Sequence, residues 1–205
     1  MAAHGRRTLR NLFDDSPTPH IAHPPETHHR DFYVATDGSY RHDGCGGLGV
    51  IVETRGGKRV TRVAVPDSAP NNNVAEYRAL QLGLDVLAER SPPDARVGVL
   101  VDHDELARNV NAQILAFRDP RKPMHQITLP PGVEHDWQDV QERLAGFPAV
   151  RAALIDGDAN PAHPLANDPA AYEHVNDGPV RCVLSEEEPV TEVPPPSRSS
   201  RNASD

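Results

Sequence analysis

The stretch Asn71–Arg90, NNNVAEYRALQLGLDVLAER, decides the predicted fold. Four of its residues are spaced at i, i+4, i+7 and i+11, which places them on one face of a helix: Glu76, Leu80, Gly83 and Leu87. This spacing predicts an α-helix whose face presses on a sheet. A glycine on that face would let helix and sheet approach closely.

Three β-rich runs precede this helix: FYVATD at Phe32–Asp37, LGVIVE at Leu48–Glu53 and RVTRVAV at Arg59–Val65. The pair Gly56-Gly57 lies between the second and third runs and predicts a hairpin there. We therefore expect three antiparallel strands in chain order.

After the helix, RVGVLVD at Arg96–Asp102 is an almost continuous apolar run, as expected of a strand covered on both faces. A parallel crossover places it beside the first strand. Further on, the patterns predict a helix at Asp136–Phe147, a strand at Val150–Ile155 and a broken helix at His163–His174. The fold class is α/β, with a mixed five-stranded sheet of three antiparallel strands followed by parallel ones, and helices on both faces.

The two ends of the chain have a different composition. Residues 1–30 are rich in Pro and His without apolar periodicity, which predicts a flexible leader, and a solvated linker is favoured over a metal-binding tail. Residues 178–205 combine five Pro with the acidic triplet Glu186 to Glu188 and predict a disordered tail. Residues 31–177 are left as the folded domain.

Composition excludes several classes of protein. No apolar run approaches a membrane span, and no signal peptide is visible at the start. Cys45 and Cys182 lie far apart without ligand spacing, which argues against a zinc finger or disulfide scaffold and predicts a cytoplasmic location. The formal charge of −9 has the wrong sign for a broad basic nucleic-acid face, so any such contact must be local or metal-assisted. No obligate protein partner is evident.

Three carboxylates occupy distinctive places: Asp37 on the first strand, Glu76 in the first helical turn and Asp102 at the end of the fourth strand. If the first and fourth strands are parallel neighbours, these side chains converge at one edge of the sheet. Clustered carboxylates repel one another unless a cation compensates them. Oxygen ligands of this kind suit Mg²⁺ or Mn²⁺.

Each carboxylate also has a purely structural interpretation. Asp37 with its following Gly and Ser would suit a turn. The spacing from Asn73 to Glu76 is that of a helix capping box. Asp102 would suit the N-cap of the next helix, and Asp104 competes with it as a ligand.

The segments carrying these residues resemble the type I ribonuclease H family in order and approximate spacing. They are TDGS at Thr36–Ser39, GCGGLGVIV at Gly44–Val52, NNNVAEYRALQLGL at Asn71–Leu84 and VLVDHDELARNVN at Val99–Asn111. The resemblance covers about residues 31–111 well and about 136–170 loosely. It implies a ribonuclease H-like fold, with Asp37, Glu76 and Asp102 as metal-binding catalytic carboxylates.

The resemblance also implies an activity: two-metal hydrolysis of the RNA strand in an RNA–DNA hybrid, with Mg²⁺ or Mn²⁺. Six residues would contact substrate: Gly38, Ser39, Cys45, Gly46, Asn72 and Asn73. The alternatives are a nucleic-acid-binding or interaction module with impaired catalysis, or another nuclease on the same fold.

One position departs from the family. The family usually has a fourth carboxylate in a pattern like N-x-x-A-D-x-L-A, whereas this chain has Asn160-Pro-Ala-His163-Pro-Leu-Ala166. We expect His163 beside the metal-bound water as a ligand or proton shuttle. The other candidates for the missing ligand are Asp156, Asp158 and Asp168, and the loop cations Arg118, Arg121 and Lys122 are expected to act as local positive handles.

Overall fold

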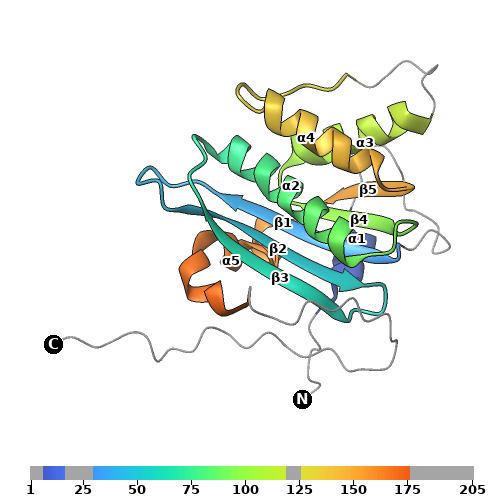
Figure 1. Ribbon diagram of the computed structural model, residues 1–205, viewed down its shortest axis with the longest axis horizontal. Coiled ribbons are helices and arrows are strands. Elements are labelled where there is room, and N and C mark those ends of the chain that lie inside the picture. The colour runs from blue at the N-terminus through green and yellow to red at the C-terminus, as the bar shows by residue number, and fades with distance from the viewer. Residues whose placement is uncertain (1–6, 17–29, 119–125, 176–205) are drawn as a thin grey trace.

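The computed structural model describes residues 7–16, 30–118 and 126–175. Figure 1 shows the elements in chain order. They are α1 (Leu9–Asp15), β1 (Phe32–Ser39), β2 (Gly46–Thr54), β3 (Arg59–Asp67), α2 (Asn72–Arg90), β4 (Arg96–Val101), α3 (Asp104–Arg118), α4 (Glu134–Ala145), β5 (Ala149–Leu154), α5 (His163–Asn167) and the short 3-10 helices η2 (Gly157–Ala159) and η3 (Pro169–Val175).

The sheet has five strands in the order β3-β2-β1-β4-β5. β1 pairs antiparallel with β2, and β2 antiparallel with β3. β1 pairs parallel with β4, and β4 parallel with β5. The predicted mixed sheet is therefore confirmed, and its parallel pairs bring the carboxyl ends of β1 and β4 to the same edge.

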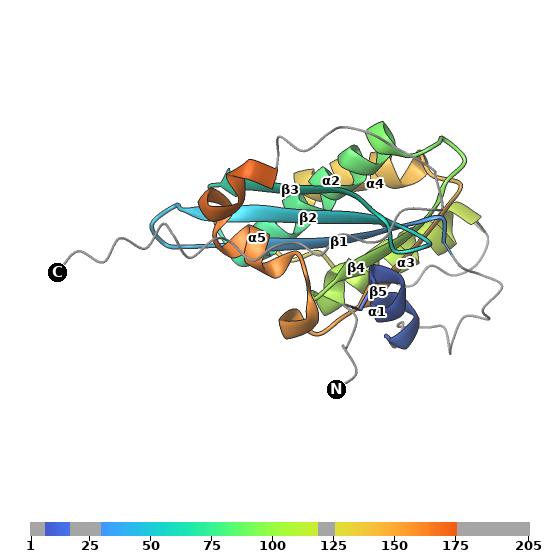
Figure 2. The ribbon, with the colours of Figure 1, turned by 90° about the horizontal axis from the view of Figure 1, so that it is seen from below.

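Helices α2, α3 and α4 pack on one face of this sheet (Figures 1 and 2). The core there combines Val34 and Val50 of the sheet with Leu80 and Leu87 of α2. Gly83 explains how closely α2 approaches, because a Cβ on it would lie 2.6 Å from Thr36 Cγ2. The predicted helix face and its glycine contact are thus confirmed.

The opposite face is covered by α1, α5 and η3 (Figure 2). The expectation of a flexible leader is wrong for Leu9–Asp15, which form α1. Leu9, Leu12 and Phe13 are buried in the core of this face. Their i, i+3, i+4 spacing is a helix signal, but it spans a single seven-residue helix and is lost in the polar composition of residues 1–30.

A polar contact and an aromatic contact hold α1 in place. The fully buried carboxylate of Glu53 on β2 accepts a hydrogen bond from the Leu9 backbone N–H at 2.8 Å. It also accepts one from Arg59 Nη2 at 2.9 Å. Phe13 meets Tyr33 edge to face, with ring centroids 5.3 Å apart, so α1 belongs to the folded domain.

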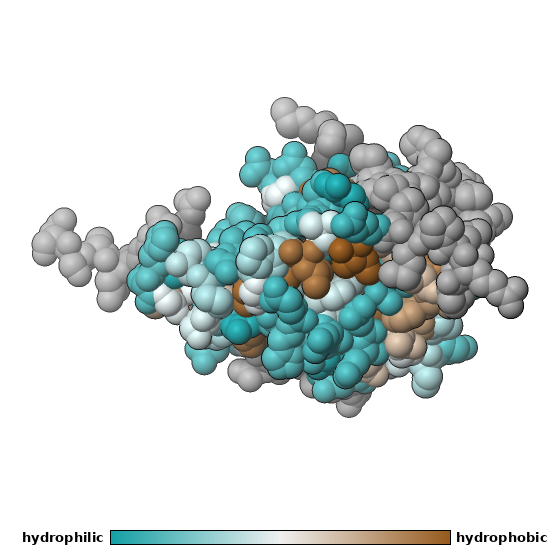
Figure 3. Space-filling model, turned by 90° about the horizontal axis from the view of Figure 1, so that it is seen from above, coloured by the Kyte–Doolittle hydropathy of each residue, from teal (hydrophilic) through white to brown (hydrophobic). Residues whose placement is uncertain are grey.

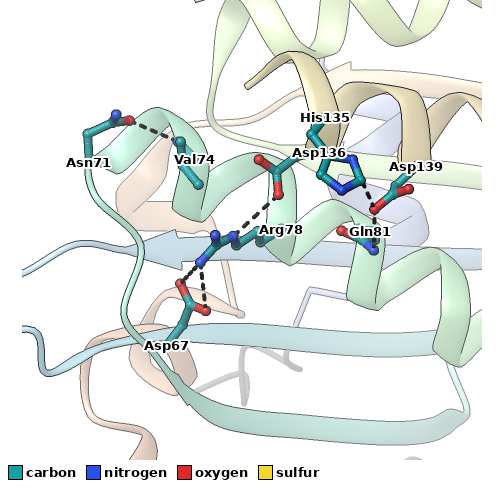
Figure 4. A network of polar contacts seen from close by, with 8 residues as sticks. All are labelled: Asp67, Asn71, Val74, Arg78, Gln81, His135, Asp136 and Asp139. Carbon is teal, nitrogen blue, oxygen red and sulfur yellow. Dashed lines mark hydrogen bonds and ion pairs between the residues drawn. The ribbon is translucent and has the colours of Figure 1, made fainter. Parts of the chain in front are cut away.

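A polar seam joins α2 to α4, and Figure 4 shows its contacts. Arg78 of α2 lies between Asp67 and Asp136, at 3.3 Å from an oxygen of each. Gln81 donates to Asp139 at 3.2 Å. The seam fixes α4 beside α2 on the rim of the apolar core.

Figure 3 looks down on the molecule from above and shows a mostly hydrophilic surface with a small apolar area. In the described part of the chain, the large apolar side chains that remain exposed are Leu115 and Phe117. None of the described helices combines the length and the apolar character needed to cross a membrane. The predicted tail at 178–205 and the cations Arg121 and Lys122 lie outside the described residues.

Candidate active site

Asp37 lies inside β1 rather than in a turn, so its interpretation as a turn residue is wrong. Gly38 follows it at the point where β1 touches the start of α2. A Cβ at Gly38 would lie 2.2 Å from the Ala75 carbonyl carbon, so only glycine fits this contact. The close approach brings the first turn of α2, with Glu76, to the end of β1.

Glu76 is not part of a capping box. Asn71 caps α2 instead, because its side chain accepts from the Val74 backbone N–H at 3.0 Å. Glu76 is only 4% exposed, and the Gly38 backbone N–H donates to it. Its Oε2 has no hydrogen-bond partner among the described residues.

Asp102 follows the last residue of β4, and it does not cap α3. His103 takes that role, since its Nδ1 accepts from the Leu106 backbone N–H at 3.2 Å. Asp104 is exposed and pairs with Arg108, so it is not the ligand candidate. Asp102 Oδ1 is buried without a partner among the described residues.

Glycines of β2 place His163. A Cβ at Gly49 would lie 2.4 Å from the Ala162 carbonyl oxygen, and one at Gly47 would lie 2.6 Å from that of Ala166. These gaps let α5 rest directly on β2. Asn160 anchors the preceding loop, because its Nδ2 donates to the Thr36 carbonyl oxygen at 3.0 Å. His163, the first residue of α5, thereby reaches Asp37.

A polar chain then orients the His163 ring. His163 Nδ1 lies 3.2 Å from Asp37 Oδ2, and its Nε2 lies 2.7 Å from Asn167 Nδ2. The Ser39 hydroxyl donates to Asn167 Oδ1 at 2.8 Å. If Asp37 is ionised and the His163 ring carries its proton on Nδ1, each of these three contacts joins a donor to an acceptor.

These side chains share an open cleft of about 310 Å³. Its lining residues are Asp37, Gly38, Ser39, Asn72, Glu76, Asp102, His103, Gly157, His163 and Asn167. Ligand atoms of Asp37, Asp102 and His163 lie within 4.8 Å of one another. The four residues predicted to be catalytic are thus brought together.

The predicted substrate-contacting residues divide into two groups. Gly38, Ser39 and Asn72 line the cleft, whereas Cys45, Gly46 and Asn73 do not. Cys45 is exposed in the β1–β2 loop, and its backbone N–H donates to Asp43. Contact of any of these six residues with substrate stays a prediction.

Burial and like charge both act on the carboxylates. Desolvation, with the charge of Asp102, raises the pKa of Asp37 to about 7, although His163 opposes the rise. Desolvation, with the charges of Asp102 and Asp37, raises the pKa of Glu76 to about 9. Without a cation both carboxylates therefore favour their protonated form more than free carboxylates do, and a bound cation would stabilise the ionised form.

The residues present fit a hard divalent cation. Three carboxylates surround the cleft, and buried oxygens of Glu76 and Asp102 have no partner in the described part of the chain. An unpartnered buried oxygen is costly, and a metal ion would relieve that cost as well as the mutual repulsion. The donor set of oxygens plus one imidazole suits Mg²⁺ or Mn²⁺.

The other candidates for the fourth ligand are exposed, as His163 is, and they differ from it in their place. Asp156 caps η2 by accepting from the Asp158 backbone N–H, and Asp168 accepts from that of Ala171. None of the three aspartates lines the cleft. Of these four candidates only His163 lines the cleft, and its role as the fourth ligand stays a prediction.

Comparisons with solved structures bear on the fold. The LC11 ribonuclease H1, isolated from compost by a metagenomic approach, matches with a TM-score of 0.56 and 21% identity over 69% of this chain and 99% of that chain. Ribonuclease H1 of the halophilic archaeon Halobacterium salinarum matches with a TM-score of 0.55 and 17% identity, over 69% and 98%. The chain has the ribonuclease H fold.

A third match is the N-terminal ribonuclease H domain of a Mycobacterium tuberculosis protein, with a TM-score of 0.52 and 21% identity over 67% of this chain and 96% of that chain. No protein-family model matches the sequence, and no curated protein does. The resemblance read from the sequence is therefore confirmed for the ribonuclease H fold.

Sequence reasoning missed three members of the site: His103, Asn167 and Gly157. A Cβ at Gly157 would lie 3.2 Å from Asp102 Oδ2, so this glycine keeps the space beside Asp102 open. Asn167 lies four residues after His163, the i, i+4 spacing of one helix face, and that signal was available in the sequence.

Proposed function

We propose that this protein is a metal-dependent endoribonuclease that cleaves the RNA strand of RNA–DNA hybrids. The observation that carries the proposal is the convergence of Asp37, Glu76 and Asp102 with His163 in one open cleft of a ribonuclease H fold. The LC11 ribonuclease H1, which matches at 22% identity with a TM-score of 0.51, has been solved in complex with an RNA/DNA hybrid.

The proposed cofactor is Mg²⁺ or Mn²⁺, with two ions per site. Bound ions of this kind make a nucleophile from water and stabilise the leaving oxygen in phosphodiester hydrolysis. Asp37 faces both Asp102 and His163, so we assign it as the shared ligand. We assign Glu76 to the leaving-group side and Asp102, with His163, to the side of the nucleophile.

Contacts with a negatively charged substrate would come from individual residues of the cleft. The net charge of −9 opposes binding of nucleic acid, so local donors must supply the contacts. Asn72 and Ser39 line the cleft: the Asn72 amide can donate to sugar and phosphate oxygens, whereas the Ser39 hydroxyl, whose proton goes to Asn167, can accept from a sugar hydroxyl. Discrimination of RNA from DNA would depend on the 2′-hydroxyl, the group that distinguishes the two sugars. A cytoplasmic location stays a prediction.

The experiment is a substrate panel with the full chain. Labelled RNA–DNA hybrid, duplex RNA, duplex DNA and single strands are incubated with Mg²⁺, with Mn²⁺ and with EDTA. The proposal expects metal-dependent cuts in the RNA strand of the hybrid alone. Binding of the hybrid without cleavage in either metal would indicate the module with impaired catalysis, and cleavage of duplex DNA would indicate a different nuclease.

A further inference from the structure

His103 stands on the cleft wall next to Asp102, where α3 begins. Its Nδ1 accepts from the Leu106 backbone N–H at 3.2 Å. A backbone N–H can only donate, so Nδ1 carries no proton and the neutral ring carries its proton on Nε2. The helix start itself therefore selects the tautomer of this histidine.

The Nε2–H of His103 points at the start of α2. It donates to Asn73 Oδ1 over 3.0 Å. Because this donor fixes Oδ1 as the acceptor, the orientation of the Asn73 amide is also fixed. The two N–H groups on Asn73 Nδ2 have no hydrogen-bond partner among the described residues, and they remain available to a ligand.

The His103 ring packs against buried aromatic side chains. It meets Tyr77 edge to face, with centroids 6.3 Å apart. Tyr77 is fully buried, its hydroxyl accepts from Asn109, and it also contacts Trp137. His103 thus connects the starts of α2 and α3 through groups that have little freedom to move.

Three consecutive asparagines at the start of α2 have different tasks. Asn71 uses its side chain to cap the helix. Asn72 is exposed and lines the cleft. Asn73 is half-buried, and the only hydrogen bond of its side chain in the described part of the chain is the one to His103. Asn71 thus has a structural role and Asn72 lines the cleft, whereas Asn73 does not line the cleft but is bonded to His103, which does.

We propose that His103 is a positioning residue for substrate: it orients the Asn73 amide so that its N–H groups donate to sugar or phosphate oxygens of the nucleic acid strand. The inference rests on the proposed function and deepens it. It assigns to His103 a part in affinity, separate from the metal-binding role of its neighbour Asp102. Amide donors suit backbone oxygens, so the contact would add affinity without reading sequence.

Two near-isosteric variants separate the two bonds of the ring. His103→Asn keeps an acceptor near the place of Nδ1 but loses the donor to Asn73. His103→Gln keeps a donor near the place of Nε2 but loses the helix cap. Hybrid binding is measured in EDTA, where no metal contributes, and KM and kcat are measured with metal.

For His103→Asn we expect a Kd for the hybrid weakened about threefold to tenfold, the worth of one hydrogen bond. KM should rise by a similar factor while kcat changes less. His103→Gln should recover most of the lost affinity and should instead lower the melting temperature. A merely structural role would give the same loss of affinity in both variants.

A double-mutant cycle tests whether His103 acts through Asn73. Asn73→Ala should weaken binding about as much as His103→Asn, and the double variant should be no weaker than Asn73→Ala alone. Independent, multiplying effects would overturn the proposal, as would unchanged affinity in His103→Asn. A wild-type protein that neither binds the hybrid in EDTA nor cleaves it with Mg²⁺ or Mn²⁺ would refute the proposed function itself, and with it this inference.

The tautomer supplies a readout that needs no substrate. In the metal-free protein, the ¹⁵N NMR spectrum of His103 should show a protonated Nε2 and an unprotonated Nδ1. A proton on Nδ1 would contradict the proposal whatever the activity. This result distinguishes a wrong account of His103 from a wrong substrate class.

Discussion

His163 Nδ1 lies 3.2 Å from Asp37 Oδ2, so an imidazole directly contacts the carboxylate that faces the rest of the site. The ring is about half exposed, whereas Asp37 is only 4% exposed. By resemblance, a fourth carboxylate would stand at the position of His163. The site therefore offers three carboxylates and one nitrogen, with one negative charge fewer than four carboxylates would supply.

The first prediction concerns metal preference. Mn²⁺ accepts a nitrogen ligand more readily than Mg²⁺, which prefers oxygen. His163→Asp should therefore shift binding toward Mg²⁺, and His163→Ala should weaken Mn²⁺ binding, both measured by calorimetric titration of the folded protein. Asp156→Ala, at an exposed aspartate, is the control. An unchanged Mn²⁺/Mg²⁺ ratio, rate and pH profile in His163→Ala would show that the ring faces solvent without a function.

The second prediction concerns stability without metal. The folded-state pKa of Asp37 is raised from 3.8 to about 7 and that of Glu76 from 4.5 to about 9, so the folded state binds more protons than the unfolded state in this range. The free energy of unfolding must then fall as the pH rises from about 4 to about 9. We expect this contribution to be on the order of a few kcal/mol.

Urea unfolding in EDTA at several pH values measures this slope. Asp37→Asn with Glu76→Gln should flatten it and should stabilise the metal-free protein at the alkaline end. If the double variant kept the wild-type slope, the repulsion assigned to these two carboxylates would be absent.

The third prediction concerns α1. Phe13→Ala removes a buried ring that contacts Tyr33 and should lower the free energy of unfolding by about 3 kcal/mol. Asn11→Ala changes an exposed residue of the same helix and should have an effect within about 0.5 kcal/mol. Deleting residues 1–16 should lower the melting temperature more than Phe13→Ala. A truncated protein that melts like the full chain would show that α1 does not belong to the core.

The fourth prediction concerns the glycines under α5. Gly49→Ala would place a Cβ 2.4 Å from the Ala162 carbonyl oxygen, and backbone there cannot move without displacing His163. We expect both stability and metal affinity to fall. Gly56→Ala is the control, because its nearest neighbour to a Cβ is Thr54 Oγ1 at 3.9 Å. Equal metal affinity in the two variants would contradict the role given to the β2 glycines.

Much of the fold followed from local patterns. After Arg96, strand β4 is apolar from Val97 to Val101 because both of its faces are covered, and this pattern depends on neighbouring residues alone. The face of α2 with Leu80 and Gly83 is likewise a local spacing. α1 escaped prediction because its three core residues act through long-range contacts with β1 and β2, which no window of residues 1–30 contains.

The carboxylates of the site were predictable for a similar reason: Asp37 lies in the last part of β1 and Asp102 directly follows β4, and both strands are recognisable in the sequence. His103 was not, because its partner Asn73 lies thirty residues away in the chain. The capping-box spacing from Asn73 to Glu76 was misleading, since Asn71 supplies the cap and the buried Glu76 faces the cleft. Contacts between side chains of different helices and strands depend on tertiary packing, which cannot be derived from the spacing of residues within one segment.

The most direct test of the central claim is single-turnover cleavage of an end-labelled RNA–DNA hybrid by the wild-type chain and by Asp102→Asn, each with Mg²⁺ and with Mn²⁺. Asp104→Asn, at an exposed neighbouring aspartate, is the matched control. The account predicts that wild type and Asp104→Asn cut the RNA strand to 5′-phosphate and 3′-hydroxyl ends, while Asp102→Asn stays folded and is slower by at least about 100-fold. Cleavage by Asp102→Asn at the wild-type rate, or no cleavage by the wild type in either metal, would contradict it.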